Sequence, residues 1–372
     1  MHVSVYLRPK DKLFSVLPLH HTYESTIGFL YPFSQGASVA VCEGLKYLVS
    51  NLKETKPTAI LAVPLLLENL YKKINQNIKK SGKETIVNSM IHVTNALKAV
   101  GIDIKRKVFA EILENLGGNL RIIVSAAAPM DKKIAKWLED IGIEFLQGYG
   151  LTETAPISAL TPESDPRTGS VGKAVVCAQI KINNPNEDGE GEVWIKSSTL
   201  MLGYYEMEEE TKKVVKDGWF NSGDIGYLDK DGYLYITGRS KNVIVTANGK
   251  NIYPEEIELI LGNIPYISEC MVYGKGEKDN LTVSVKVIPN YTYIKENVKE
   301  DMTDEEIYNL IWEEIKKVNK TLTSYKAIKC LEIKKDEFEK TTTMKIKRFA
   351  EIKKDKEKEE KEKKEKSTKS KK

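Results

Sequence analysis

LRIIVSAAAPMDKKIAKWLEDIGIEFLQGYG, residues 120–150, is a short apolar run, a polar-faced segment and a second apolar run. The two apolar runs are typical of strands that are buried on both faces. Between them, Asp131 is a suitable N-cap for an amphipathic helix that closes near Gly142. Strand and helix in this alternation predict an α/β layer built on a mostly parallel sheet.

The same alternation extends toward the amino terminus. Strands are expected over residues 37–43 and 57–64, helices over 65–83 and 103–118, and an amphipathic segment over 46–56. The run KLFSVLPLHH, residues 12–21, is also read as a buried strand. A buried strand needs cover on both faces, yet few residues precede this one. We therefore expect its usual neighbours to come from upstream, and poor solubility without them.

The pattern changes near residue 169, where short strands alternate with Gly and Asp turns. LDKDGYLYI predicts a hairpin with its turn at residues 230–232, within a small antiparallel β unit. Mixed signals return after GRSKN, residues 238–242. Helices are expected over 253–264 and 303–322, and strands over 267–276, 280–289 and 327–335. The predicted domains are residues 1–239, residues 240–350 and a charged tail, 351–372.

Composition narrows the class of protein. The chain has 372 residues and a net charge of +4, and it shows neither a membrane-length apolar stretch nor a signal peptide. Its four cysteines are far apart, which favours reduced thiols over disulfides or zinc ligands. The tail interleaves Lys with Glu, so it is read as a solubilising helix or disordered segment; contact with anionic lipid or nucleic acid is the alternative. We expect a cytoplasmic protein.

Two strands end in segments suited to a nucleotide. SAAAP (125–129) and GYGLTET (148–154) each follow an apolar run, and ligands of open α/β sheets bind beyond the carboxyl ends of strands. Tyr149 offers a ring for stacking, the Thr152 hydroxyl suits a phosphate, and Glu153 suits Mg²⁺. The alternative is that GYG is only a turn before a helix.

Later residues extend the nucleotide hypothesis. Asp224, in a turn after an aromatic strand, suits the two hydroxyls of a ribose; the alternative is a turn residue that bonds its own backbone. Arg239 has the fork that suits a ribose or a phosphate. Lys345 lies in a Lys-rich end, where composition alone favours plain solvation.

The order of these pieces is more specific than any one of them. LPLHHTYE, SAAAP, GYGLTET, GSVGK, the long stretch from Asp217 to Glu258 and TTTMKIKR follow one another over roughly residues 10 to 350. This set resembles the adenylate-forming superfamily of acyl-CoA synthetases, luciferases and adenylation domains. LPLHHTYE and Lys241 are most similar to the long-chain fatty acyl-CoA synthetase branch.

The resemblance implies a two-step reaction with ATP, Mg²⁺ and coenzyme A. A fatty acid carboxylate attacks the α-phosphate to give acyl-AMP and pyrophosphate, and a thiol then displaces AMP. It also implies roles for matching positions. Adenine would be lined by Ser125, Ala126, Ala127, Gly148 and Tyr149, and the ribose would be held by Asp224 and Arg239. Thr152 would contact the α-phosphate, Glu153 would hold Mg²⁺, and Lys345 would neutralise the charge that develops at the α-phosphate. His21 would lie at the acyl and pyrophosphate end, Lys241 would be the hinge of the small domain, and Gly249 would approach coenzyme A.

The implied fold is the remainder of a large α/β domain with a small β unit, followed by a small mobile α+β domain. There are departures from the family pattern. Ser222 replaces a usual Thr and Met344 a usual Gly, and the phosphate loop of the type TSGTTGxPKG is not in this sequence.

That absence leaves alternatives to a complete ligase. They are a catalytically impaired remnant that binds a nucleotide or acyl-AMP, or one half of a split synthetase whose other half is a separate chain. A ligase that loads an acyl-carrier protein is a further alternative. For His21 the alternative is a buried structural role. We expect no nucleic-acid partner, and at most weak association with a membrane surface.

Overall fold

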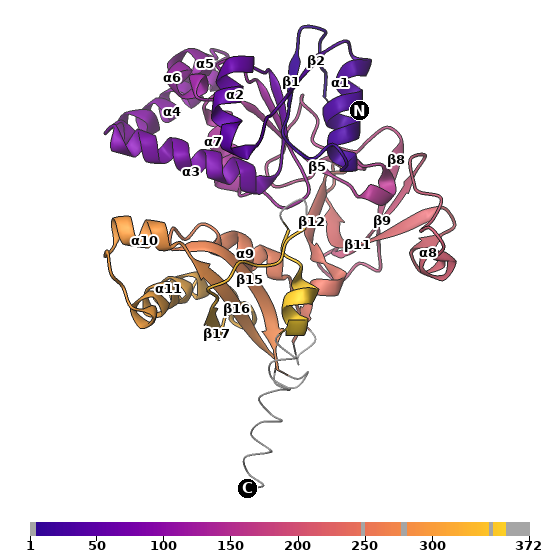
Figure 1. The fold of residues 1–372 in the computed structure, drawn as a ribbon. Helices are drawn as coiled ribbons and strands as arrows, with labels where there is room; N and C mark the ends of the chain where they lie inside the picture. Colours follow the sequence, from indigo (N-terminus) through magenta and orange to yellow (C-terminus); the bar gives the residue numbers. More distant parts are fainter. Residues whose placement is uncertain (1–4, 247–249, 277–280, 342–344, 355–372) are drawn as a thin grey trace. The chain divides into compact units, whose positions relative to one another are not determined.

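The computed structural model describes residues 5–246, 250–276, 281–341 and 345–354 (Figure 1). The chain divides into two compact units, Met1–Ser240 and Lys241–Lys372, called the first and the second unit below. Within the described residues, no helix combines the length and the apolar character that a membrane crossing requires.

A seven-stranded sheet forms the base of the first unit, in the order β2-β1-β3-β4-β5-β6-β7. The first five strands run parallel, and β6 and β7 are antiparallel additions. This confirms the α/β prediction. The strands are β1 (Lys12–Ser15), β2 (Ser38–Val41), β3 (Ala59–Ala62), β4 (Ile122–Ser125), β5 (Glu144–Tyr149), β6 (Ala159–Leu160) and β7 (Lys173–Ala174).

Helices cover both faces of the parallel strands (Figure 1). Alternate residues of β3 show the division: Ile60 packs with the helices of one face, and Leu61 packs with those of the other. Every residue of β3 and β4 is therefore buried, which explains their continuous apolar runs. One face carries α2 (Leu48–Thr55), α3 (Pro64–Lys80), α6 (Ala110–Glu114) and α7 (Lys132–Asp140); the other carries η1 (Glu24–Leu30), which continues into α1 (Tyr31–Ser34).

Some predicted elements of the first unit differ from the observed ones. The strand predicted over 12–21 ends at Ser15, and Leu19 is half-exposed beyond Pro18. The helix predicted over 103–118 is two short helices, α5 (Lys105–Val108) and α6, because Phe109 leaves helical geometry between them. Helix α4 (Glu84–Ala99) was not predicted; Thr94 is its one buried residue, and Val87 and Ile91 on the same face are partly buried against the core. The Asp131 cap is confirmed, since its carboxylate accepts from the Lys133 N–H.

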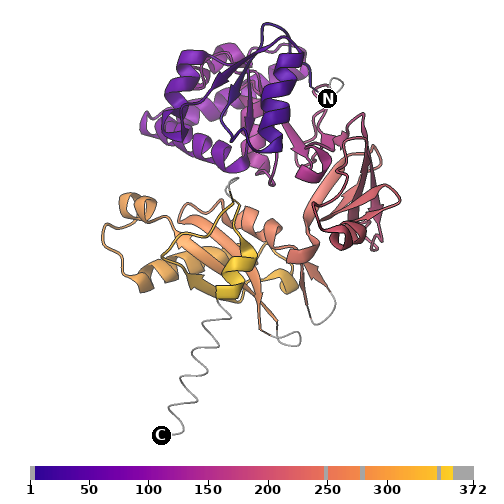
Figure 2. The ribbon, with the colours of Figure 1, turned by 45° about the vertical axis from the view of Figure 1, so that its right-hand side comes forward.

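The small antiparallel β unit is also confirmed (Figure 2). Its strands pair in the order β10-β11-β9-β8, with β12 on β11 and α8 (Glu208–Val214) beside β10. At the predicted hairpin turn, the Asp229 carboxylate accepts from two backbone N–H groups and Gly232 has φ +81°. The strands are β8 (Ala178–Asn183), β9 (Gly191–Ser197), β10 (Val215–Lys216), β11 (Trp219–Leu228) and β12 (Leu234–Arg239).

The second unit is an α+β fold with its own core. Its main sheet has the order β15-β16-β17, and helices α9 and α11 pack on it. Thr303 and Glu306 form a capping box at the start of α11, the helix that is expected over residues 303–322. The elements are β13 (Ile244–Val245), β14 (Asn251–Ile252), α9 (Pro254–Leu261), β15 (Ile267–Lys275), β16 (Thr282–Pro289), α10 (Tyr291–Asn297), α11 (Asp304–Asn319) and β17 (Cys330–Ile333).

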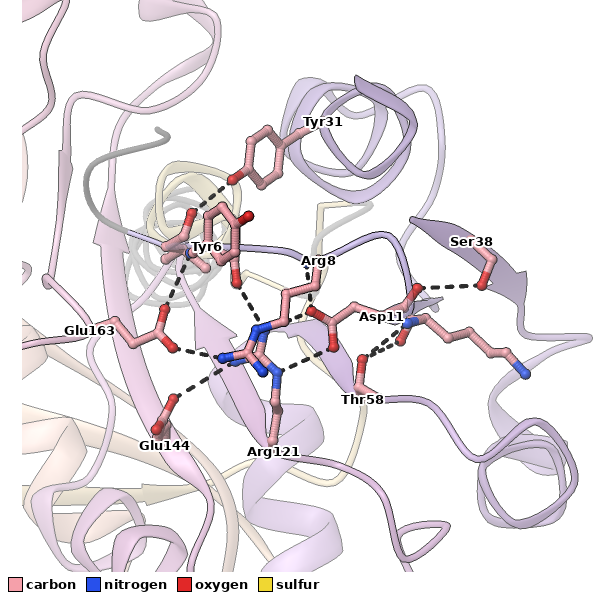
Figure 3. Close-up of polar contacts among 11 residues, drawn as sticks. Tyr6, Arg8, Asp11, Tyr31, Ser38, Thr58, Arg121, Glu144 and Glu163 are labelled. Atoms are coloured by element: carbon pink, nitrogen blue, oxygen red, sulfur yellow. Dashed lines mark hydrogen bonds and ion pairs between the residues drawn. The ribbon is translucent and has the colours of Figure 1, made fainter. Parts of the chain in front are cut away.

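A charge network lies where β4 begins, at the amino edge of the parallel strands (Figure 3). Arg121 donates to the Asp11 carboxylate at 2.9 Å and to the Tyr6 carbonyl at 2.9 Å, and it pairs with Glu163 at 3.3 Å. The Arg8 N–H donates to Asp11 at 2.7 Å. Asp11 is 3 % exposed, so this network ties the residues before β1 to β4 with a buried ion pair.

We expect Asp11→Asn to destabilise the first unit by about 2 kcal/mol at pH 7. Although burial opposes ionisation, hydrogen bonds from Arg121, Arg8 and Thr58 lower the pKa of Asp11 from 3.8 to about 2. Because the pKa of Asp11 is lower in the folded than in the unfolded chain, its ionisation stabilises the fold at pH values above the unfolded pKa. This contribution is lost as the pH falls from about 4 through 2. Urea unfolding at pH 7 and at pH 3 measures the difference.

Glu111→Gln is the matched control, because it removes an exposed pair with Lys83 and should cost under about 1 kcal/mol. The expectation fails if Asp11→Asn matches the wild type at pH 7, or if its deficit does not narrow at the lower pH.

Candidate functional site

Three of the predicted segments meet at one edge of the parallel sheet. β1, β4 and β5 run in the same direction, so their carboxyl ends lie together. His21 follows β1, the SAAAP segment starts on the last residue of β4, and Tyr149 is the last residue of β5. The topology therefore places these side chains beyond the strand ends, where ligands of open α/β sheets bind.

The central contact joins the parallel sheet to the antiparallel one. The Tyr149 hydroxyl donates to Asp224 Oδ2 at 2.7 Å, and Arg239 Nε donates to Asp224 Oδ1 at 2.9 Å. Asp224 is 3 % exposed, whereas the Arg239 side chain is half-exposed. Burial and the adjacent Asp224 carboxylate hold the pKa of Tyr149 well above its ordinary value, so the phenol remains a donor. The alternative that Asp224 only bonds its own backbone is wrong.

Strand register and one hydroxyl position the Asp224 carboxylate. Asp224 and Arg239 are direct partners across β11 and β12, which puts both side chains at the same place in the hairpin. Ser222 Oγ donates to the Val193 carbonyl at 2.7 Å and accepts from the Asp224 N–H at 3.1 Å. Either Ser or Thr supplies this hydroxyl, so Ser222 keeps the contact that a Thr at this position would make.

The GYGLTET segment is held by its own side chains. Thr152–Thr154 forms a short 3₁₀ turn, η3, in which Thr154 Oγ1 accepts from the Leu151 N–H at 3.1 Å. Thr152 is exposed, so its hydroxyl is accessible. Glu153 Oε1 accepts from the Tyr204 hydroxyl at 2.9 Å. Burial and this hydrogen bond raise the pKa of Tyr204 to about 12, so Tyr204 is a donor that orients Glu153.

Tyr204 was not predicted as a site residue from the sequence. Only the aromatic pair in MLGYYE signals it, and the two partners are far apart in the chain. The fit of Mg²⁺ rests on Glu153. Mg²⁺ is commonly held by one or two carboxylates together with substrate phosphates, and Glu153 is a single oriented carboxylate of this kind. Across the described residues, no group of three or more His, Cys, Asp or Glu gathers as a preformed metal cluster.

The SAAAP segment carries backbone strain. Ala127 has φ +79°, in a region that residues with a side chain rarely adopt and that recurs at binding sites. Ser125 is fully buried, and its hydroxyl has no hydrogen-bond partner among the described residues. Ala126 is buried beside it. A strained loop of small residues lets a flat ligand approach the backbone closely.

His21 is half-buried, and its Nδ1 accepts from the Tyr23 N–H at 3.1 Å. In the neutral ring the proton is therefore on Nε2. Glu24, three residues after His21, was not predicted as a site residue. It is fully buried, and neither carboxylate oxygen has a hydrogen-bond partner of ordinary geometry among the described residues. Burial raises the pKa of Glu24 from 4.5 to about 7, and the nearby Ser15 hydroxyl acts in the opposite sense.

We expect Glu24→Gln to stabilise the first unit by about 2 kcal/mol at pH 8 and to have little effect at pH 5. Because the pKa of Glu24 is higher in the folded than in the unfolded chain, its contribution to stability is fully present at pH values below the unfolded pKa of 4.5. That contribution is lost as the pH rises through 7. Ionising the buried Glu24 carboxyl costs the wild type about 3 kcal/mol, and the variant avoids this cost. Because the variant buries an amide instead, its net gain in stability is smaller than that cost. Thermal unfolding against pH measures the effect, with Glu84→Gln, an exposed change, as control. Parallel curves for Glu24→Gln and wild type would contradict it.

The remaining predicted residues lie at the start of the second unit or within it. Lys241 is in η4 (Ser240–Asn242), where the chain passes between the units. Lys345 is exposed, and its N–H donates to Thr341 Oγ1 at 3.2 Å. Gly249 and Met344 lie outside the described residues.

Comparisons with known proteins match both units. The family model of AMP-binding enzymes covers residues 1–205, and the model of the AMP-binding enzyme C-terminal domain covers residues 241–358. Long-chain-fatty-acid–CoA ligase FadD15 of Mycobacterium bovis is 32 % identical over 281 residues, which is 72 % of this chain and 46 % of the relative. Long chain acyl-CoA synthetase 4 of Arabidopsis thaliana is 32 % identical over 72 % of this chain and 43 % of its own length. This chain thus spans about half the length of such relatives.

Solved structures share the fold. Anthranilate CoA ligase AuaEII, crystallised with anthranoyl-AMP, superposes with a TM-score of 0.69 at 23 % identity, over 94 % of this chain and 60 % of that one. ATP-bound MatB from Rhodopseudomonas palustris gives a TM-score of 0.68 at 21 % identity, over 92 % and 60 % of the two chains. At these identities the likeness concerns the fold alone.

Proposed function

This chain belongs to the AMP-binding enzyme family, and on that premise we propose that it binds an acyl-adenylate and acts in the activation of a long-chain fatty acid and its transfer to coenzyme A. The proposal of a long-chain acid follows the names of the curated relatives, which are long-chain fatty acid–CoA ligases or synthetases. ATP and coenzyme A are the proposed co-substrates.

The observation that carries the proposal is the Tyr149–Asp224–Arg239 contact. Its buried carboxylate is an acceptor next to a ring and a guanidinium. Such a carboxylate accepts hydrogen bonds from the vicinal hydroxyls of a ribose, while the Tyr149 ring offers a face to adenine. The half-exposed Arg239 adds positive charge on the side from which an anionic ligand approaches. Ser125, Ala126, Ala127 and Gly148 complete the proposed adenine side.

The chemistry proposed for the phosphate end uses charge and position. The substrate carboxylate forms a bond to the α-phosphorus as the bond to pyrophosphate breaks, and Thr152 and Lys345 stabilise the negative charge that develops. Glu153 would hold Mg²⁺, which neutralises phosphate charge when bound. His21 is proposed at the acyl and pyrophosphate end. In the second step a thiolate attacks the acyl carbonyl, and AMP leaves with the electron pair of the broken bond.

Lys241 is proposed as the hinge about which the second unit turns between the two steps. The proposed domains are a large-domain segment of residues 1–239 and a small domain of residues 240–350. Lys241 therefore lies at the start of the small domain. The Gly249 loop would then approach coenzyme A, and Gly tolerates such close backbone approach. An acyl-carrier protein is the alternative thiol.

The test supplies the intermediate directly. Synthetic palmitoyl-AMP and coenzyme A are incubated with the purified 372-residue chain, and palmitoyl-CoA and AMP are quantified by mass spectrometry. Parallel reactions contain a phosphopantetheinyl carrier protein in place of coenzyme A, or ATP, Mg²⁺ and palmitate in place of the adenylate. We expect thioester formation from palmitoyl-AMP well above a reaction without protein. Binding of AMP without any thioester would instead favour a nucleotide-binding protein that does not turn over, and absence of both would reject the proposal.

A further inference from the structure

The described residues around Lys345, 338–341 and 345–352, belong to the second unit and are called the Lys345 segment below. Lys340 and Ile346 form an antiparallel bridge, and the Thr341 N–H donates to the Lys345 carbonyl at 2.8 Å. The Lys347 N–H donates to the Glu339 carbonyl at 2.7 Å. These bonds set the local shape of the segment, but they do not attach it to the rest of the unit.

Apolar packing attaches one face of the segment. Phe338, which is 3 % exposed, lies in a small cluster with Met271 and Tyr273 of β15, and Ile346 and Ile352 pack against it. Such contacts hold the segment on the sheet without directional bonds, so they tolerate small shifts along the surface. Lys340 adds one directional contact before Lys345, because its Nζ donates to Glu269 Oε1 of β15 at 2.5 Å. After Lys345, the register of the segment needs a second directional contact.

Arg348, three residues after Lys345, makes that contact. One guanidinium nitrogen donates to the Val272 carbonyl at 2.8 Å, a second bonds Glu258 Oε2, and Nε lies 3.8 Å from Glu255 Oε1. The side chain is only 17 % exposed. The fork thus engages a strand carbonyl and two carboxylates of α9 at once, a geometry that the point charge of a lysine does not reproduce.

Glu258 of α9 contacts both Val272 of β15 and Arg348. Its Oε1 accepts from the Val272 N–H at 2.5 Å while its Oε2 meets Arg348. Burial raises the pKa of Glu258, and the charge of Arg348 opposes that rise. Buried pairs of this kind contribute little net stability against apolar substitutes, and their best attested use is to specify one arrangement over its neighbours.

The contact also reaches the residue beside the proposed hinge. Glu255 Oε1 accepts from Asn242 Nδ2 at 2.6 Å, and Asn242 ends η4, directly after Lys241. A continuous set of polar contacts therefore runs from Asn242 through Glu255 to Arg348, with α9 as the rigid element between them.

We propose that Arg348 is a positioning residue that sets the register of Lys345 and couples it, through Glu255 and α9, to Asn242 beside the hinge. The inference rests on the proposed function for the role of Lys345 in adenylate formation. Arg348 touches no substrate in this scheme. Its effect should therefore fall on the adenylate-forming step, which uses Lys345, and not on thioester formation from a supplied adenylate.

The experiment compares Arg348→Gln and Arg348→Lys with a matched control, Lys326→Gln. Lys326 has the same side-chain exposure, 17 %, and pairs with Glu256 of α9 at 2.6 Å, but it makes no contact with the Lys345 segment in the described structure. Hydrogen exchange of the whole chain is followed by mass spectrometry for residues 345–354 and 240–246. Both half-reactions are measured: ATP formed from palmitoyl-AMP and pyrophosphate, and palmitoyl-CoA formed from palmitoyl-AMP and coenzyme A.

We expect Arg348→Gln to accelerate exchange in both segments and to lower the adenylate half-reaction by about 100-fold through kcat, the size of effect that a displacement of about 1 Å produces. Thioester formation should change by less than about threefold. Arg348→Lys should rescue little, and Lys326→Gln should leave both segments and both rates unchanged. Equal losses in the two half-reactions, full rescue by Lys, or unchanged exchange would overturn the proposal.

The two hypotheses fail in different ways. If the wild-type chain performs neither half-reaction, the proposed function fails, and hydrogen exchange alone still decides whether Arg348 anchors the segment. If the wild-type chain is active and Arg348→Gln is indistinguishable from it, the proposed function stands and the positioning role is rejected.

Discussion

Asp224→Ala is expected to weaken AMP binding to this chain by about 100-fold. The carboxylate is proposed to accept hydrogen bonds from both ribose hydroxyls, and a hydrogen bond to a charged group is worth about 1.5–3 kcal/mol. The substitution also removes the acceptor of Tyr149 and Arg239, which lie 2.7 Å and 2.9 Å from it. A loss of about 3 kcal/mol corresponds to that change in Kd. Isothermal titration calorimetry with AMP measures it.

Asp231→Ala is the matched control for this prediction. Asp231 is an exposed carboxylate in the turn of the β11–β12 hairpin, at the end opposite to the Asp224–Arg239 pair. It should bind AMP as the wild type does. A native circular dichroism spectrum for Asp224→Ala separates lost binding from lost folding. If the folded Asp224→Ala variant keeps its affinity within about threefold, the ribose assignment is wrong.

Gly150→Ala is expected to destabilise the first unit by at least about 3 kcal/mol, and so to lower Tm by about 6–12 °C. A Cβ at Gly150 would lie 1.9 Å from the Pro156 carbonyl oxygen and 2.8 Å from Ile157 Cα. Both are backbone atoms, so no side-chain rotation relieves the overlap. Because Gly150 follows Tyr149 directly, the shifted turn should also weaken AMP binding.

Gly148→Ala, two residues earlier, is the control for stability. There the closest atoms to a Cβ are side-chain ends, Ile157 Cδ1 at 3.2 Å and Leu160 Cδ1 at 3.3 Å, which can move by a few tenths of an ångström; the Ala159 carbonyl oxygen, at 3.7 Å, is in ordinary contact. Differential scanning calorimetry should place Gly148→Ala within about 1 kcal/mol of wild type. Equal Tm values for the two variants would show that the turn at Gly150 adapts, contrary to the expectation.

Elements with continuous or strictly periodic apolar patterns were predictable from the sequence. The buried strands β3 and β4 contain only small or apolar residues and Ser125, and the capped helix α7 follows β4 directly. The secondary structure of such segments can be predicted from their own residues alone. Helix α4 was not predicted, although Ile86, Met90 and Val93 recur at helical spacing; in the structure these three side chains are exposed.

The candidate site was predictable in part. Tyr149, Asp224 and Arg239 came from motif order, and the structure brings them together, although composition alone left Asp224 open as an ordinary turn residue. Tyr204 and Glu24 were not found. The contact of Tyr204 with Glu153 depends on how two sheets of the first unit meet, and the isolation of Glu24 depends on complete burial. Neither property can be predicted from the neighbouring residues in the sequence, because both depend on tertiary packing.

Strand β4 has consequences for experimental handling. Arg121, with its charge network, stands just before this strand, and Ser125, where the proposed adenine segment starts, is its last residue. At about 3.3 Å per residue, the two positions are about 13 Å apart. A fluorophore or affinity tag attached near the described amino-terminal residues therefore sits at the edge remote from the ligand. The same labelling position therefore serves stability measurements on Asp11 variants and AMP titrations on Asp224 variants.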